Sequence, residues 1–140
     1  MNHEKLLIKA VNFEECDIIS SLVQDSILHI SFHSFHEDQK CLRLMLNRFC
    51  WEFTNSFDEK KCYYRVHSGL YIHNVNSIMV NNNIREHSYL NMLTLHSSKN
   101  EINLVFSGNK HMRVNIGNIL VYLKDLHEKH PTLSLPVHGG

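Results

Sequence analysis

Several residue patterns that carry common protein chemistry are missing from this sequence. Its five glycines form neither a G-x-G-x-x-G run nor a P-loop, so nucleotide binding through those motifs is excluded. No serine stands in a Gly-x-Ser-x-Gly elbow, and no two cysteines have the C-x-x-C spacing of many zinc and redox sites. No apolar run approaches the roughly 20 residues that a membrane span requires.

The chain also lacks an excess of charge of one sign. Lysine and arginine together number 14, as do aspartate and glutamate. Counterion release therefore offers little drive for binding nucleic acid or an anionic membrane, and we expect no specific nucleic-acid partner. The N-terminal segment has no long apolar stretch of the secretory type, so we expect a cytoplasmic protein with reduced thiols.

Histidine, in contrast, is abundant, with 12 residues. The densest group is His29, His33 and His36, which Cys41 follows. His29 and His33 would lie about 13 Å apart on one strand face, too far for a single metal ion. The sequence thus predicts exposed histidines, no metal site and no cofactor. The pair His127-x-x-His130 is explained by the end of a helix, where imidazolium complements the helix dipole.

The spacing of apolar residues predicts, in order, a short strand, a helix, about seven antiparallel strands and a second helix. Asn12 and Glu15 have capping-box spacing, so a first helix should run over 13–23. Apolar residues at 119, 120, 123 and 126 predict a C-terminal amphipathic helix over 118–128, which Pro131 ends. Alternating apolar residues predict strands at 5–11, 27–33, 42–53, 63–67, 70–75, 78–80, 90–96, 102–106 and 112–116. The two segments 63–67 and 70–75 can also form one long strand.

This order of elements predicts an α+β fold in a single domain of residues 1–130, with a flexible tail at 131–140. A strongly bent antiparallel sheet can close on itself while the C-terminal helix covers an open end, as in a pleckstrin-homology-like barrel. The alternative is an open antiparallel sheet with both helices packed on one face.

The most informative stretch is 42–53, LRLMLNRFCWEF, because its apolar alternation changes phase in the middle. Leucines at 42, 44 and 46 mark one face, whereas aromatic residues at 49, 51 and 53 mark a face one residue out of step. A β-bulge at Asn47-Arg48 would absorb the change. Arg48 needs a partner to stay charged, and Glu52 is the expected one. Cys50 is expected on the outer sheet face.

Four segments also stand out as a set: LVQDSIL at 22–28, LNRFCWE at 46–52, SGL at 68–70 and FSG at 106–108. Together they resemble a family of uncharacterised alphaproteobacterial proteins that is catalogued as a domain of unknown function. The pattern L-N-R-F-x-W-E is the most specific part of the resemblance. The family carries a basic stretch before Ser-Gly-Leu, of which this chain retains Arg65. The resemblance implies a bacterial, cytoplasmic protein and no assigned activity.

The sequence contains no convergent catalytic set, and we predict no catalytic residue. The leading hypothesis is a non-enzymatic binding or adaptor domain for a protein or peptide partner. Its candidate binding residues are Asn47, Arg48, Glu52 and Arg65. One alternative is a small acid-base enzyme that uses Arg48, Glu52 and a histidine. The other is a self-associating, homo-oligomeric structural component, because a net charge near zero offers little resistance to association.

Overall fold

In the computed structural model, an 11-stranded antiparallel sheet accompanies a single α-helix across the described residues, 5–30, 35–53, 63–81, 83–85, 88–132 and 136. The first half contains β1 (Leu7–Ala10), α1 (Phe13–Val23), β2 (Ile27–His29), β3 (Phe35–His36), β4 (Cys41–Phe49) and β5 (Tyr63–Ile72). The second half contains β6 (Val75–Val80), β7 (Tyr89–Ser98), β8 (Glu101–Phe106), β9 (Lys110–Ile116), β10 (Val121–Asp125) and β11 (His130–Thr132). Two short 3-10 helices, η2 (Glu37–Gln39) and η3 (Trp51–Phe53), flank β4.

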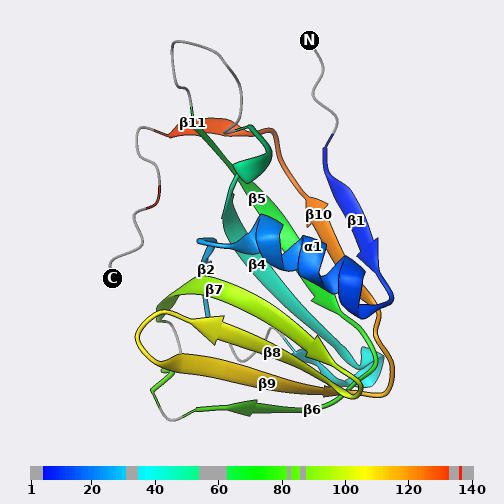
Figure 1. The fold of residues 1–140 in the computed structure, drawn as a ribbon. Helices are drawn as coiled ribbons and strands as arrows, with labels where there is room; N and C mark the ends of the chain where they lie inside the picture. The colour runs from blue at the N-terminus through cyan, green and yellow to red at the C-terminus, as the bar shows by residue number, and fades with distance from the viewer. Residues whose placement is uncertain are drawn as a thin grey trace.

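The strands follow the order β1-β10-β5-β4-β2-β7-β8-β9-β6, with β3 beside β4 and β11 beside β5. Short β2 thus links one group of long strands to the other. Figure 1 shows the β7–β8–β9–β6 group below the β1–β10–β5–β4 group, with α1 crossing in front of β4 and β5. The helix packs against β7, β1 and β4, so it covers the inner face of the bend.

The first helix forms where its capping residues predict it. The amide of Glu15 donates to the Asn12 side chain over 2.8 Å, and the Glu15 carboxylate accepts from the Val11 amide over 2.9 Å. These two bonds satisfy amides at the helix start that have no partner within the helix. On its inner face, Cys16, Ile19 and Val23 are buried in the core, and the prediction of this helix is confirmed.

One hydrophobic core joins the helix to both groups of strands. The inward positions of β4, β5 and β10 contribute leucine, isoleucine and valine, and β7, β8 and β9 contribute the rest. Every second residue of β8 and β9 is buried, as expected of strands with one covered face. The predicted hairpin of 102–106 with 112–116 is confirmed, since Ile102 pairs with Val114 and Leu104 with Met112.

The predicted α+β fold with about seven strands and a C-terminal helix is wrong, because the described chain is mostly sheet with one α-helix. Residues expected in the second helix form β10, which lies between β1 and β5. Val121, Leu123 and Asp125 alternate inward, while Lys124 is exposed. The apolar residues of this segment fit both the helical period and the strand period. Hydrogen-bonded pairing with β1 and with β5 favours the strand. The sheet order also runs from β1 to β6 without a pairing that closes a barrel among the described strands.

The predicted β-bulge at Asn47-Arg48 is also wrong. β4 pairs with β5 in an unbroken register, from Leu42 opposite Ile72 to Phe49 opposite Arg65. Arg48 continues the inward row of leucines and is fully buried. The phase change falls after the strand, where the chain turns into η3. The register shifts that the described strands do contain lie in the β6–β9 and β7–β8 pairs.

The segment after β10 adds a short strand, β11, to the sheet. β11 pairs with the start of β5, and His130 lies opposite Arg65. The rest of the predicted tail, apart from Pro136, lies outside the described residues. No helix in the described part of the chain has the length and apolar character needed to cross a membrane.

The strand assignment of 121–125 predicts a specific response to Val121→Thr. This substitution keeps the β-branched shape but places a hydroxyl in the core, where Val121 has no exposed surface. We expect the free energy of unfolding to fall by about 1–3 kcal/mol in urea titrations, whereas Lys124→Thr on the exposed face should change it by less than about 0.5 kcal/mol. A helix with its apolar face at 119, 120, 123 and 126 would make Val121→Thr nearly neutral.

Candidate functional site

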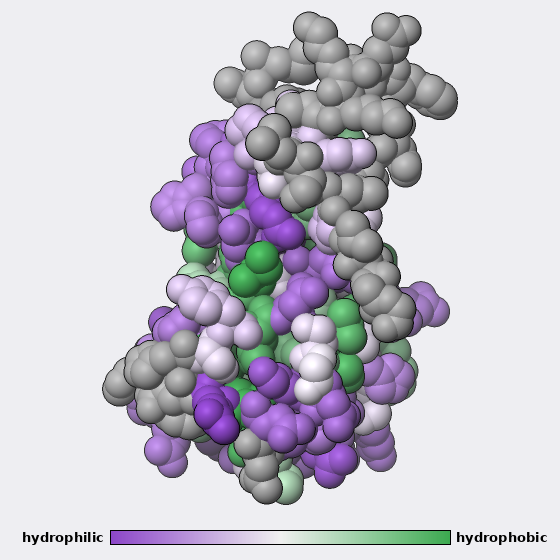
Figure 2. Space-filling view, turned by 90° about the vertical axis from the view of Figure 1, so that its left-hand side faces the viewer, coloured by the Kyte–Doolittle hydropathy of each residue, from purple (hydrophilic) through white to green (hydrophobic). Residues whose placement is uncertain are grey.

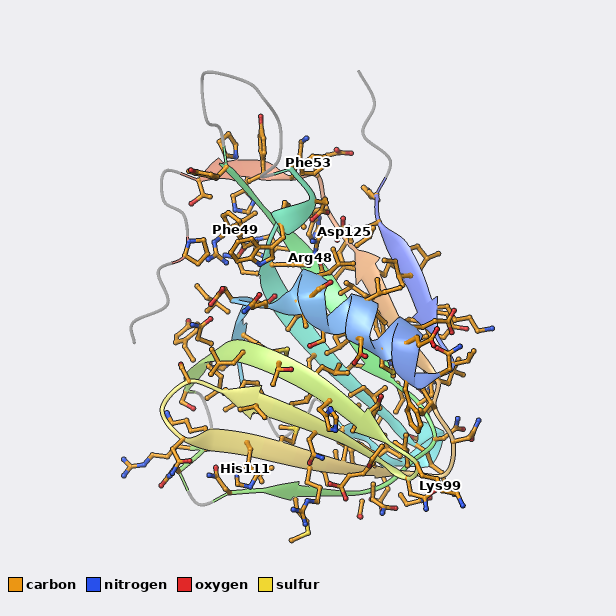
Figure 3. All side chains as sticks on the ribbon, viewed as in Figure 1. Arg48, Phe49, Phe53, Lys99, His111 and Asp125 are labelled. Atoms are coloured by element: carbon orange, nitrogen blue, oxygen red, sulfur yellow. The ribbon has the colours of Figure 1, made fainter. Side chains whose placement is uncertain are left out.

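A buried charge cluster lies on the inner face of the sheet, at the end where β4 runs into η3. Arg48 has no exposed surface, and its two terminal nitrogens donate to the two carboxylate oxygens of Glu52, each over 2.8 Å. Its Nη2 also lies 3.2 Å from both oxygens of Asp125. Figure 3 shows Arg48 and Asp125 adjacent between α1 and η3. The predicted pairing of Arg48 with Glu52 is confirmed.

The strand register explains how these residues meet. Ser68 on β5 lies opposite Leu46 of β4 and opposite Asp125 of β10. The Ser68 hydroxyl donates to Asp125 over 2.7 Å, and the Arg48 Nε lies 3.4 Å from the same hydroxyl. Asp125 also accepts from the Leu6 amide over 3.1 Å. The cluster therefore connects β4, η3, β5 and β10 to the segment just before β1.

Burial and pairing act in opposite directions on the two main charges. Burial alone would lower the pKa of Arg48, but the hydrogen bond and charge of Glu52, together with the charge of Asp125, raise it above its ordinary value. For Glu52, burial alone would raise the pKa, yet the Arg48 guanidinium holds it below the ordinary value. Both groups are thus ionised near neutral pH.

Two nearby cysteines are unsuited to nucleophilic chemistry. Cys50 is buried, not on the outer face as expected, and burial raises the pKa of its thiol to about 11. Cys16 lies on the inner face of α1 in the hydrophobic core, and burial raises the pKa of its thiol as well. Since the thiolate is the reactive form, neither side chain is activated. The cysteines in the described part of the chain are free thiols.

The other predicted binding residues, Asn47 and Arg65, lie on the opposite face of β4 and β5. Arg65 Nη1 donates to the backbone carbonyl of Asn47 over 2.9 Å, with the Asp25 carbonyl 3.4 Å away. Its guanidinium also lies 5.7 Å from the centre of the Phe49 ring, and burial lowers its pKa. The Asn47 side-chain oxygen is buried without a hydrogen-bond partner among the described residues. The four candidates therefore divide between two faces of the sheet.

A pocket of about 490 Å³ opens on this outer face, beside Asn47. Ile27, Asn47 and His67 stand in one row across β2, β4 and β5, and side chains directly opposite one another share a face. We call this feature the outer pocket. The remaining residues that line it are His29, Met45, Leu46, Ser68, Tyr89, Leu126 and His127. β2 lies on the side of the molecule that faces the viewer in Figure 2, where apolar surface is exposed between polar side chains.

Aromatic rings gather around the outer pocket. The His67 ring centre lies 5.8 Å from that of His127 and 5.6 Å from that of His130. His29 makes an edge-to-face contact with Tyr89 at 5.2 Å. The explanation of His127 and His130 by a helix end is wrong, because no helix forms there and both rings pack against His67 instead. Sequence reasoning missed His67 and Tyr89 as pocket residues, since only the strand register brings them beside Asn47.

A second, smaller pocket of about 130 Å³ adjoins the charge cluster. Glu52 and Asp125 line it together with Cys50, His127 and Lys129. The Lys129 ammonium lies over the rings of Phe53 and Tyr64, 3.9 Å and 4.4 Å from their centres. It has about a quarter of the volume of the outer pocket. Asp125, which sequence reasoning also missed, could have been found as the polar member of the Val121-x-Leu123-x-Asp125 alternation.

Metal binding finds no support in the described part of the chain. There, no group of three or more histidine, cysteine, aspartate and glutamate side chains is arranged to hold a metal ion. His33, one member of the histidine group weighed as a metal site, lies outside the described residues.

The fold and site define a mostly β domain with one covering helix, a buried ion-pair cluster and a separate outer pocket. The chain belongs to the family described as "Protein of unknown function (DUF2948)", whose model matches residues 6–138. The family membership expected from the sequence is thereby confirmed. No curated protein and no solved structure matches the chain.

The charge cluster predicts a large effect of Arg48→Met. The substitution leaves Asp125, which is 8% exposed, without its cation, so we expect the free energy of unfolding to fall by about 3–5 kcal/mol in urea titrations. The control is Arg113→Met, which breaks the exposed pair of Arg113 with Glu101 and should cost less than about 1 kcal/mol. Combining Arg48→Met with Asp125→Leu should restore only part of the loss, because Glu52 still lacks its cation and the Leu6 amide and the Ser68 hydroxyl lose their acceptor. Equal effects of the two single variants would contradict this role of Arg48.

The lowered pKa of Glu52 predicts that the protein loses stability as the pH falls into the acid range. A carboxyl whose pKa is lower in the folded state stabilises the fold above its unfolded value, and that contribution is lost as pH falls through the folded value. Glu52→Gln should therefore be less stable than the wild type at pH 7, with a difference that shrinks below about pH 4. Urea unfolding at pH 7, 5, 4 and 3 measures this difference. A difference that stays constant down to pH 3 would be inconsistent with the ion pair.

Proposed function

We propose that the protein is a non-enzymatic binding domain and that the outer pocket is its binding site. The pocket itself carries this proposal, because about 490 Å³ lies within the range of roughly 300–1,000 Å³ typical of small-molecule sites. Its lining combines apolar side chains with a few hydrogen-bonding groups, as such sites do. Ile27, Met45 and Tyr89 supply exposed apolar surface at its edge.

Asn47 supports a binding role for this face. An unpaired buried polar atom costs free energy, roughly 1–3 kcal/mol, and in a native protein it calls for an explanation. The Asn47 amide oxygen has no partner among the described residues, so this side chain contributes less to the fold than an apolar one would. Asn47 also lines the outer pocket, so the proposed site includes a side chain that can donate and accept hydrogen bonds.

The acid-base alternative has weaker support. Both oxygens of Glu52 are engaged by Arg48, and its pKa is lowered, whereas a general acid or base works best with a pKa near the operating pH. Arg48 is fully buried and already has two carboxylate partners. Neither group is therefore offered to a substrate, although His127 and Glu52 line the same small pocket.

Exposed apolar side chains on β1 and α1 also favour binding of a partner protein. Leu7, Phe13 and Ile18 are large apolar side chains of β1 and α1 with more than half of their surface exposed. They favour association with another chain, including a second copy, as a second candidate function. We further propose a cytoplasmic location, which the free thiols of the described cysteines support.

Filling the outer pocket tests the proposal directly. Met45 lines the pocket and is 52% exposed, while Met79 on β6 lies outside it and is 65% exposed. We expect Met45→Trp to abolish the binding of small molecules that ligand-observed NMR detects with the wild type in a fragment library. Met79→Trp, the matched control, should retain the same hits. Both variants should unfold at the wild-type urea concentration, because each changes an exposed side chain.

The pattern of hits decides the outcome. A library that yields no hit on the wild-type chain contradicts a small-molecule binding site. Hits that survive Met45→Trp place binding elsewhere on the molecule and equally contradict the proposal.

A further inference from the structure

The lining of the outer pocket is unusual in its charge. Among the described residues that line it, three are histidines and none is an aspartate, glutamate, lysine or arginine. His29, His67 and His127 come from β2, β5 and the segment after β10, and all three are exposed. Histidine is the side chain whose ordinary charge change falls between about pH 5 and 8, and no acid stands among the described residues of the lining.

The elements around the pocket add more positive than negative charge. Lys124 on β10 shares a row with Met45 through Gly69, and His130 lies against His67. The other titratable or charged groups on these elements are Cys41, Arg43 and Arg48 on β4, Tyr63, Tyr64, Arg65 and Tyr71 on β5, Tyr89 and His96 on β7, Tyr122 and Asp125 on β10, and Asp25, Glu128 and Lys129 in adjoining segments.

The carboxylates of these elements are engaged or directed elsewhere. The charge of Asp25 acts on Arg65, and Glu128 lines the smaller pocket instead of the outer one. Asp125 and Glu52 are paired with Arg48 on the inner face. Among the described residues of the outer pocket, a cationic ligand would find no carboxylate, whereas an anionic ligand would find up to three imidazoles. One of these, His127, also lines the smaller pocket with Glu52 and Asp125.

We propose that the outer pocket binds a small organic acid, with its carboxylate held by His29, His67 and His127. Its apolar body lies on Ile27, Met45 and Tyr89. A carboxylate accepts short, charge-assisted hydrogen bonds from imidazolium, and the apolar side chains provide the area that small ligands bury. This inference rests on the proposed function, because it names the ligand class of the same site.

Three probes with one ring and different head groups test the charge preference. Benzoate, benzamide and benzylamine carry an anionic, a neutral and a cationic group, and benzoate is ionised at both pH 6 and pH 8. We expect benzoate to bind most tightly in NMR titrations of the full chain. Its dissociation constant should be about fivefold lower at pH 6 than at pH 8, whereas that of benzamide should not change.

Histidine variants assign the pH dependence to the pocket. The double variant His29→Gln, His67→Gln should lose most of the pH dependence of benzoate binding, because only His127 remains of the three imidazoles that hold the carboxylate. The matched control is His111→Gln on β9, which Figure 3 places at the far end of the molecule from Arg48. That variant should keep the wild-type pH dependence. A double variant that also keeps it, or a control that loses it, would overturn the assignment.

The outcomes separate this inference from the proposed function. If benzamide or benzylamine binds as tightly as benzoate and Met45→Trp removes that binding, the site stands and the acid preference is wrong. If none of the three probes binds but library hits do, the ligand class is again wrong. A peptide with a free C-terminal phenylalanine that binds more than tenfold tighter than benzoate would overturn a small acid in favour of a chain terminus. If neither the three probes nor any library compound binds, both the proposed function and the proposed ligand class are rejected.

Discussion

The fold depends on neutralising one positive charge inside the sheet. Arg48 occupies an inward position of β4 with no exposed surface, where an unpaired guanidinium would cost several kcal/mol. Glu52 and Asp125 meet it from η3 and β10, two elements more than 70 residues apart in the chain. Ser68 and the Leu6 amide complete the hydrogen bonds of Asp125. Because each of these elements must be in place for the others to be satisfied, the cluster fixes the order of strands at this end of the sheet.

The alternation of β4 assigns neighbouring residues to different tasks. Arg48 points inward to the ion pair, and Asn47 beside it points outward to the row with Ile27 and His67. The inner cluster has its carboxylates and guanidinium paired with one another, while the outer face presents exposed imidazoles and a larger pocket. Successive side chains of a strand point to opposite faces of the sheet. β4 can therefore carry Arg48 on its inner face and Asn47 on its outer face. The inner cluster thereby holds the backbone that positions the outer pocket.

The sequence predicts the local features of this fold well and the long-range ones poorly. The Asn12 and Glu15 cap, the helix that follows it, the β8–β9 hairpin and the pairing of Arg48 with Glu52 all depend on residues close in the chain. Arg48 and Asp125 caused the two main errors. Each is a charged residue at an inward position of a strand: the first indicated a bulge, and the second hid the alternation of β10, so the apolar residues at 119, 120, 123 and 126 indicated a helix. Each residue is the buried partner of the other, and only the β4–β5–β10 register reveals that both belong to regular strands.

The outer pocket could not be predicted from the sequence for the same reason, because only the pairing of strands brings its residues together. His67, His29 and Tyr89 belong to three strands, and no motif connects them until β2 lies between β4 and β7. The outer pocket also differs from the inner cluster in the chemistry of its polar groups. The lowered pKa of Glu52 confines the loss of the ion pair to acid pH, whereas histidine changes charge between about pH 5 and 8. An ion pair that persists from pH 8 to pH 6 keeps the backbone of the outer pocket in place over this interval. Binding that varies over this interval reports on the pocket histidines and not on loss of the fold.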